Sequence, residues 1–165
     1  MTIVIEGALK ELRSLKRVGE KAFAQLEHDD DFHRELAPDA NSIAILIQHL
    51  AGNMISRWTD FLTSDGEKLT RDRDAEFASS RLSRAALLGR WDEGWAAVFA
   101  AIEPLTDEDL GRIVYIRGEA HTVARAIVRQ VQHYAIHIGQ ILYIAKCLKG
   151  DAWRTLSIPR AAARQ

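Results

Sequence analysis

The chain has 165 residues, 47% of them hydrophobic and 27% charged, a balance that suits one globular domain with a core of ordinary size, and we expect residues 1–165 to form one domain. The formal net charge is −1, so no overall field would attract nucleic acid or an anionic membrane, and we expect neither as a partner. Cys147 is the only cysteine and the first residues reach charge at Glu6 without a long apolar run, so we expect a cytoplasmic protein.

Two helices are predicted in the first part of the chain. Apolar residues recur every three or four positions from Ile5 to Leu26, which places them on one face of a helix. The acidic segment after it contains Pro38 and has no sustained period, so we expect a connection there. Ser42 has the position of an N-cap, and the pattern predicts a second helix from Ile43 to about Leu62.

A long crossing loop is predicted between the second and third helices. It begins with TSDGEK, in which Asp-Gly is typical of a turn, and continues through the charged run RDRDAEFASS. Long loops in small domains are often functional. A third helix, capped by Ser83, is predicted to end before Pro104 and to contribute mainly to the core.

The last part of the chain predicts a small ribbon and the longest helix. Residues 112–122 combine β-branched side chains with an Arg-Gly-Glu turn, which indicates two short strands or an irregular substitute for them. The fourth helix is expected from Thr122 to Lys149, with Gly150 as its C-terminal stop. The tail contains Trp153 and Pro159, and we expect it to pack back over the bundle.

Three histidines are candidate metal ligands. His133 and His137 are four residues apart on a helix, so their side chains share one face and both imidazoles can reach one ion. His49 lies in an apolar stretch of the second helix, where an unpaired buried imidazole would be costly. A ligand from a second helix is how bundle cores build open metal sites. The alternative is a hydrogen-bonded or surface histidine pair without a metal.

The sequence also resembles a known superfamily. HLAGNMISRWTDFLT, the RDRDAEF loop, HTVARAIVRQVQHYAIHIGQILYIAK and the WRTLSIPR tail are similar to the DinB-like, YfiT-like metal-binding bundles, in particular a branch of small bacterial proteins. The similarity covers nearly the whole chain. It implies an all-α four-helix bundle with a long crossover between helices two and three, and homodimers are frequent among such proteins.

The resemblance implies that His49, His133 and His137 form a metal triad, and it leaves the reaction open. Some relatives are transferases or isomerases that use low-molecular-weight thiols, and others are labelled hydrolases by analogy. Three neutral imidazoles leave a divalent ion its full charge, which can activate a bound water or hold a thiolate. Zinc or nickel is expected first, with iron, manganese or copper as alternatives.

Several polar residues are weaker candidates for substrate binding. Asn53 lies one helical turn beyond His49, where it could orient a bound water or form an ordinary buried hydrogen bond. The remaining candidates are arginines that could clamp a substrate carboxylate and carboxylates that could act as a base, if the crossing loop covers the metal site. They are Arg57, Arg71 and Arg73, and Asp72, Asp74 and Glu76. A solvated charge run at 71–76 is the competing interpretation.

The sequence therefore predicts a divalent metal-binding protein of the DinB-like type that acts as a thiol-dependent transferase or a hydrolase on a small molecule. Its expected partners are a second copy of the chain and a low-molecular-weight thiol or other small substrate. The competing hypotheses are a non-catalytic metal-binding protein, in which the ion is structural, and a dimeric bundle without a metal.

Overall fold

Four long helices make up most of the computed structural model, which describes residues 3–79 and 81–158. They are α1 (Ile3–Phe23), α2 (Ile43–Trp58), α4 (Arg84–Ile102) and α5 (Val123–Lys149). The shorter elements are helix α3 (Arg73–Glu76), the 3-10 helices η1 (Asp29–His33), η2 (Asp107–Gly111) and η3 (Gly150–Ala152), and strands β1 (Ile113–Ile116) and β2 (Glu119–Thr122). The expected all-α class is confirmed.

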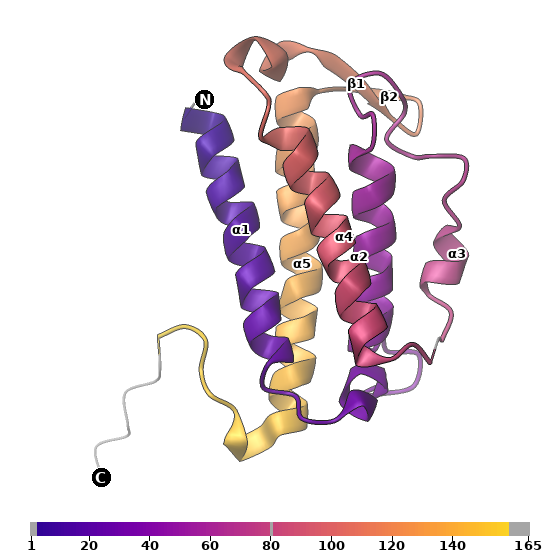
Figure 1. Ribbon diagram of the computed structural model, residues 1–165, viewed down its shortest axis with the longest axis vertical. Helices are drawn as coiled ribbons and strands as arrows, with labels where there is room; N and C mark the ends of the chain where they lie inside the picture. Colours follow the sequence, from indigo (N-terminus) through magenta and orange to yellow (C-terminus); the bar gives the residue numbers. More distant parts are fainter. Residues whose placement is uncertain (1–2, 80, 159–165) are drawn as a thin grey trace.

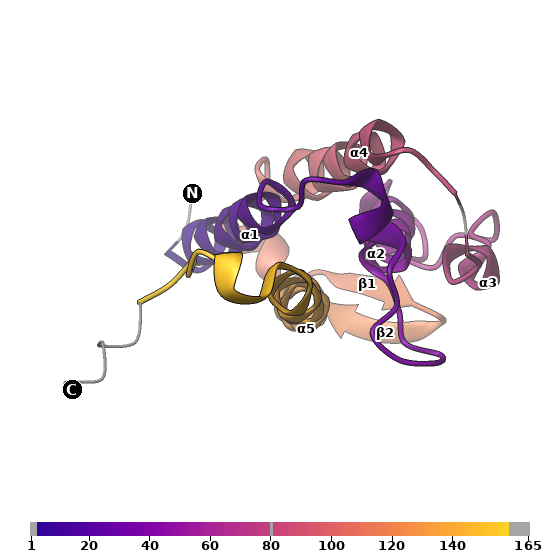
Figure 2. The ribbon, with the colours of Figure 1, turned by 90° about the horizontal axis from the view of Figure 1, so that it is seen from below.

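The four long helices form a bundle in which α2 packs mainly against α4, and α1 packs mainly against α5. Seen along the bundle axis, α1, α4, α2 and α5 surround a shared interior (Figure 2). The neighbouring helices α2 and α4 run in the same direction, so the chain must return along the length of the bundle between them (Figure 1). Residues 59–83 make this crossover and carry α3 along the outer side of α2. The predicted long crossover is thus confirmed.

Side-chain caps begin three of the helices where the sequence placed them. The hydroxyls of Ser42, Ser83 and Thr122 each accept a hydrogen bond from the backbone N–H three residues later. The end of α2 differs from the prediction, because the helix stops at Trp58 and not near Leu62. Asp60 adopts a positive φ of 49°, and its carbonyl accepts hydrogen bonds from the two residues of a turn at 63 and 64, which ends the helical ladder.

The end of α1 also differs from the prediction, because the helix stops at Phe23 and not at Leu26. The N–H of Leu26 bonds the carbonyl of Phe23, which makes a tighter turn of the 3-10 type. Leu26 still packs in the core, and this is why its apolar character extended the predicted period.

The bundle interior is one continuous apolar cluster to which all four long helices contribute. A buried hydrogen bond of 2.9 Å from Trp58 Nε1 to Tyr134 Oη joins α2 to α5 beside the second histidine of the predicted triad. The tail partly follows the prediction: Trp153 and Leu156 pack against the core, while Pro159 lies outside the described residues. Within the described part of the chain, no helix has the length and apolar character needed to span a bilayer.

The two strands form an antiparallel hairpin near the end of α2, as the sequence indicated (Figure 1). Arg117 and Gly118 occupy its turn with φ values of 56° and 75°, the signature of a type I′ turn. The carboxylate of Asp65, in the crossover, accepts hydrogen bonds of 2.9 and 2.8 Å from the N–H groups of these two residues. The hairpin and the crossover are therefore fixed to each other, which sets the position of the Arg117 side chain.

Candidate metal centre

The structure brings His49, His133 and His137 together between α2 and α5. One ring nitrogen from each lies within 4.8 Å of the others, and the ring centroids are 4.6 to 5.3 Å apart. His49 is buried, and the two histidines of α5 are partly buried. The spacing of four residues on α5 produces the pair, and the packing of α2 against α5 supplies the third imidazole.

Hydrogen bonds fix which ring nitrogen is available in two of these histidines. His49 Nδ1 lies 3.0 Å from Glu76 Oε2, and His137 Nδ1 lies 2.8 Å from Gln140 Oε1. Because both oxygens act as acceptors, each Nδ1 carries the proton and each Nε2 keeps a free lone pair. Nε2 of His133 is buried and has no hydrogen-bond partner within the described segments. The cluster therefore holds two available lone pairs and one buried ring nitrogen that has no hydrogen-bond partner in the described part of the chain.

The imidazoles of α5 are held in their neutral form. Burial lowers the pKa of His133 to about 3, and the nearby His137, His49 and Arg129 act in the same direction. Burial also lowers the pKa of His137, although its hydrogen bond to Gln140 opposes the shift. Neutral imidazole is the form that binds metal ions, so both residues are ready to act as ligands at pH 7.

The carboxylate of Glu76 reaches His49 because residue 52 has no side chain. A Cβ atom at Gly52 would lie 2.1 Å from Glu76 Oε1, which is impossible without moving the carboxylate. Burial raises the pKa of Glu76, but hydrogen bonds from Arg71 and His49 outweigh it, and the net shift of the pKa is downward. Glu76 is therefore an ionised acceptor that orients His49, a common arrangement behind metal-binding histidines.

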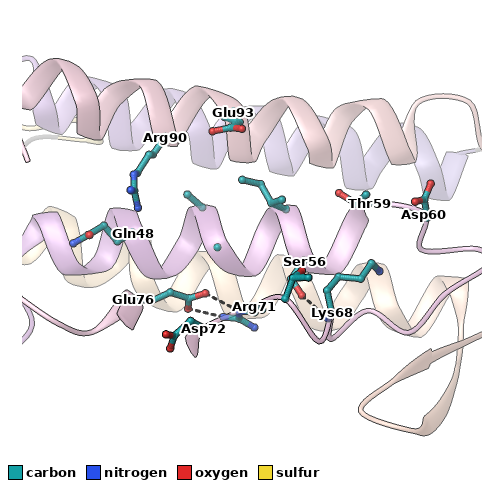
Figure 3. Close-up of a pocket in the computed structure, with 14 residues that line it drawn as sticks. Gln48, Ser56, Thr59, Asp60, Lys68, Arg71, Asp72, Glu76, Arg90 and Glu93 are labelled. Carbon is teal, nitrogen blue, oxygen red and sulfur yellow. Dashed lines mark hydrogen bonds and ion pairs between the residues drawn. The ribbon is translucent and has the colours of Figure 1, made fainter. Parts of the chain in front are cut away.

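An ion-pair network holds Glu76 in place. Arg71 donates to both of its carboxylate oxygens, from Nε at 2.6 Å and from Nη2 at 2.7 Å (Figure 3). Arg71 also contacts Glu67. This bidentate geometry makes the pair strong and directional. The interpretation of 71–76 as a wholly solvated charge run is therefore wrong, since Arg71 and Glu76 are largely buried, whereas Asp72 and Asp74 are exposed. Arg71 is occupied by carboxylates and does not form the predicted free clamp.

Two cavities lie on adjoining faces of α2, and Glu76 lines the first of them. One, of about 630 Å³, lies between α2, α4 and the crossover, where Arg90 extends from α4 toward α2 and Glu93 lies along α4 (Figure 3). Its lining carries charges of both signs. The other cavity, of about 380 Å³, contains the three histidines. The metal centre would therefore face the second cavity, while Glu76, which hydrogen-bonds to His49, lines the first.

Asn53, Arg57 and Arg73, three of the residues predicted to bind substrate, line the histidine cavity. Asn53 is 6% exposed and its Oδ1 has no partner in the described part of the chain, so the predicted ordinary hydrogen bond is absent at this atom. Arg57 is buried, with one contact of 3.5 Å to Glu67. Arg73 is exposed at the edge, with its guanidinium 5.0 Å from the ring centre of Phe77.

Sequence reasoning missed two arginines of this cavity and the role of Glu76. Arg129 lies four residues before His133, so the same helical spacing that identified the histidine pair could have found it. Arg117 could not be placed, because its position depends on the contact between the hairpin and Asp65. Glu76 was considered as a base, and its hydrogen bond to His49 depends on the path of the crossover.

The residues present fit a divalent metal ion. A buried imidazole nitrogen without a partner is costly in an apolar surrounding, and a metal ion would satisfy it. Three neutral nitrogen donors from two helices suit first-row transition metals, with zinc or nickel first and iron, manganese or copper as alternatives. Within the described residues this group contains three ligands and no fourth, which is typical of open and not of structural sites.

Fold and site together define a DinB-like, YfiT-like four-helix bundle with a three-histidine cluster. Residues 2–162 match the family described as "Protein of unknown function (DUF1572)", and the chain belongs to this DinB-like family. The chain is also similar to a solved structure, YfiT from Bacillus subtilis, with 18% identity, a TM-score of 0.65 and 90% of each chain covered. That protein is described as a probable metal-dependent hydrolase with an unusual four-helix bundle topology. At this identity the likeness shows the fold alone. No curated protein sequence matches the chain.

Proposed function

We propose that this protein is a metal-dependent enzyme in which His49, His133 and His137 bind one divalent ion beside a cavity for a small substrate. The observation that carries the proposal is the convergence of three imidazoles, with one ring nitrogen from each within 4.8 Å of the others, at a cavity of about 380 Å³. A structural metal would require a closed ligand set, and the described residues around the cluster offer no fourth ligand of the usual types.

Some residues of the site would hold the ion, and others would bind the substrate. A divalent ion bound there would supply Lewis-acid chemistry, polarising the substrate or lowering the pKa of a water or thiol ligand toward neutrality. Glu76 orients His49, and Gln140 orients His137. Asn53 and Arg73 line the cavity, where they would bind and orient the substrate, and the buried Arg57 would add a positive charge to the same wall.

Two reactions fit this arrangement, hydrolysis and transfer to a small thiol. YfiT's description favours the first, and the resemblance to thiol-using relatives favours the second. Cys147 is exposed and lies ten residues beyond His137 on α5, about 15 Å along the helix, so any thiol would have to come from a small molecule. The proposal includes a cytoplasmic location, which is favoured by the single cysteine.

Elemental analysis of the purified protein tests the metal centre. We expect about one divalent ion per chain, and replacement of any one triad histidine by Ala should lower metal retention sharply, because two ligands remain. His28→Ala and His121→Ala are matched controls that lie outside the cluster and should retain the metal. Equal metal content in His49→Ala and the wild type would refute the ligand set.

Cobalt substitution then separates the two reactions. If the enzyme uses a thiol, adding a physiological thiol should produce a sulfur-to-cobalt charge-transfer band that is absent from His137→Ala. If it is a hydrolase, the cobalt spectrum should titrate near neutral pH and activity should need no thiol. A spectrum that ignores both thiols and pH between about 5 and 9 would favour the non-catalytic alternative.

A further inference from the structure

The cavity that contains the three histidines is unusually rich in arginine. Its lining includes the arginines Arg57, Arg71, Arg73, Arg117 and Arg129, and none of its described lining residues is a carboxylate. Arginine is always charged at neutral pH and presents a planar fork of donors that matches carboxylate and phosphate groups. The charged side chains of the cavity wall are therefore all positive, which favours an anionic ligand.

The protein's own carboxylates neutralise only part of this charge. Glu76 pairs with Arg71, and Glu67 is shared between Arg71 at 3.1 Å, Arg57 at 3.5 Å and Arg117 at 3.4 Å. Arg129 has no ion-pair partner among the described residues, and Arg73 contacts only an aromatic ring there. The guanidinium groups thus outnumber the carboxylates they contact.

Arg57 is a buried guanidinium whose positive charge is only weakly compensated. It is 4% exposed, and its Nε and Nη1 have no hydrogen-bond partner within the described segments. Burying a charge is expensive unless an opposite charge compensates it, and a single contact of 3.5 Å is a weak compensation. A negative charge in the cavity would lower the electrostatic cost of keeping this guanidinium buried.

The backbone of Arg117 provides an independent indication. Its φ of 56° is in the left-handed region, which is unfavourable for a residue with a Cβ, and this is why Asn or Gly usually occupies the first position of a type I′ turn. The side chain placed there at this cost is an arginine at the mouth of the histidine cavity. Strain of this kind is often retained where the side chain has a function.

We propose that Arg73, Arg117 and Arg129 form a binding site for an oxyanion group of the substrate, a carboxylate or a phosphate, beside the three-histidine cluster. The inference rests on the proposed function, because it names the substrate class of that same cavity. The substrate would place its anionic group against these three guanidinium groups and its reacting group toward the histidines. Arg57 would attract the anionic group as a buried positive charge and would not contact it directly.

The test is calorimetric titration of the full-length, zinc-loaded protein with inorganic phosphate and, separately, with succinate. Arg73→Gln and Arg129→Gln should each weaken binding of the preferred anion about tenfold, the loss expected for one charged hydrogen bond. Arg125→Gln is the matched control, because Arg125 is exposed one turn before Arg129 on α5 and does not line the cavity. The tighter-bound anion identifies the group as phosphate or carboxylate.

Arg117→Asn adds a variant whose effect cannot result from unfolding. Asn suits the first position of the turn, so the thermal midpoint should stay equal or rise while anion affinity falls about tenfold. The inference is overturned if zinc content is normal and Arg73→Gln and Arg129→Gln bind both anions as the wild type does, or if Arg125→Gln loses as much affinity. A protein that binds no metal but still shows arginine-dependent anion binding would refute the proposed function and leave this inference standing.

Discussion

Glu76 determines how His49 can act, because an ionised carboxylate accepts a hydrogen bond and cannot donate one. The 3.0 Å contact therefore keeps the proton on His49 Nδ1 and turns Nε2 toward the other two histidines. Arg71 fixes the carboxylate in turn, and Gly52 leaves the space that it occupies. One ligand of the candidate centre thus depends on three residues that would not contact the ion.

This dependence predicts the effect of Glu76→Gln and Gly52→Ala on metal affinity. Both should weaken zinc binding about 10–100-fold, the usual cost of losing a partner of a metal-binding histidine. The second change removes no polar atom and acts only because its Cβ would lie 2.1 Å from Glu76 Oε1. Competition with a chromophoric chelator measures the affinity.

Two controls accompany these variants. Asp74→Asn removes an exposed carboxylate from the same loop, and Gly89→Ala adds a methyl group to a helix where no atom lies within 4 Å. Neither should change zinc affinity, and Gly89→Ala should raise stability by up to about 1 kcal/mol through helix propensity. Wild-type zinc affinity in Gly52→Ala would show that Glu76 does not orient His49.

At the residue scale, helical spacing and local apolar character predicted the histidine cluster but not the residues that support it. His133 and His137 are related by spacing alone, and His49 by its place in an apolar stretch, so the sequence could single out all three. The hydrogen bond between His49 and Glu76 joins residues 27 positions apart through a crossover without a period, and no local pattern indicates it. The same holds for Arg117, whose position depends on a tertiary contact.

Among the elements, the hairpin and its flanking turns determine where Arg117 lies over the cavity. The 3-10 helix η2 leads into β1, and Asp109 caps it by accepting from the N–H and hydroxyl of Thr106 and from Arg112. The hydrogen bond from the Thr106 backbone, followed by those from Arg112 and the Thr106 hydroxyl, lowers the pKa of Asp109 from 3.8 to about 2. Asp109 therefore stabilises the approach to the hairpin in its ionised form.

This lowered pKa predicts an acid-dependent stability. Because the folded-state pKa is below the unfolded value of 3.8, the contribution of Asp109 is fully present above about pH 4 and is lost as the pH falls toward about 2. Asp109→Asn should lower the thermal midpoint at pH 7 and flatten its decline between these pH values. Thermal unfolding of metal-free protein, followed by circular dichroism, measures both effects.

The matched control is Asp107→Asn, which changes a neighbouring exposed carboxylate in η2 that makes no hydrogen bond within the described residues. Its pH profile should follow that of the wild type. A steep decline between about pH 4 and 2 in Asp109→Asn, equal to that of the wild type, would contradict the assignment.

At the element scale, helix starts were predictable and helix ends were less so. The starts were predictable because each has a hydroxyl cap that bonds a backbone N–H only three residues later. The capping residues are Ser42, Ser83 and Thr122. The end of α2 depends on the positive φ of Asp60 and on turn hydrogen bonds, while the apolar period continues to Leu62. Periodicity records which residues are buried, and burial can continue after the helix has ended.

For the whole molecule, the order of helices around the bundle is information that periodicity does not contain. Four amphipathic segments fit several arrangements, and the crossover was predicted from the long charged loop between the second and third helices together with the resemblance to the DinB-like bundles. The parallel course of α2 and α4 (Figure 1) has a functional consequence, because the returning chain carries Glu76, which hydrogen-bonds to His49, and Arg71, which hydrogen-bonds to Glu76. A bundle with a short connection between these helices would lack both residues at the site.

The outer surface near the start of α1 predicts a homodimer. Ile3 and Val128 are 90% and 65% exposed, and they line an apolar groove of about 320 Å³ between α1 and α5 whose one charged described lining residue is Glu11. Exposed apolar surface of this kind is commonly buried in a symmetric contact between two copies.

We expect light scattering at micromolar concentration to report a dimer, and Val128→Glu to convert it to a monomer, because a carboxylate would be buried in the contact. Arg125→Glu, on the same helix but outside the groove, should remain dimeric. A wild-type monomer across the micromolar range, or a Val128→Glu variant that stays dimeric, would remove the groove from consideration as the interface.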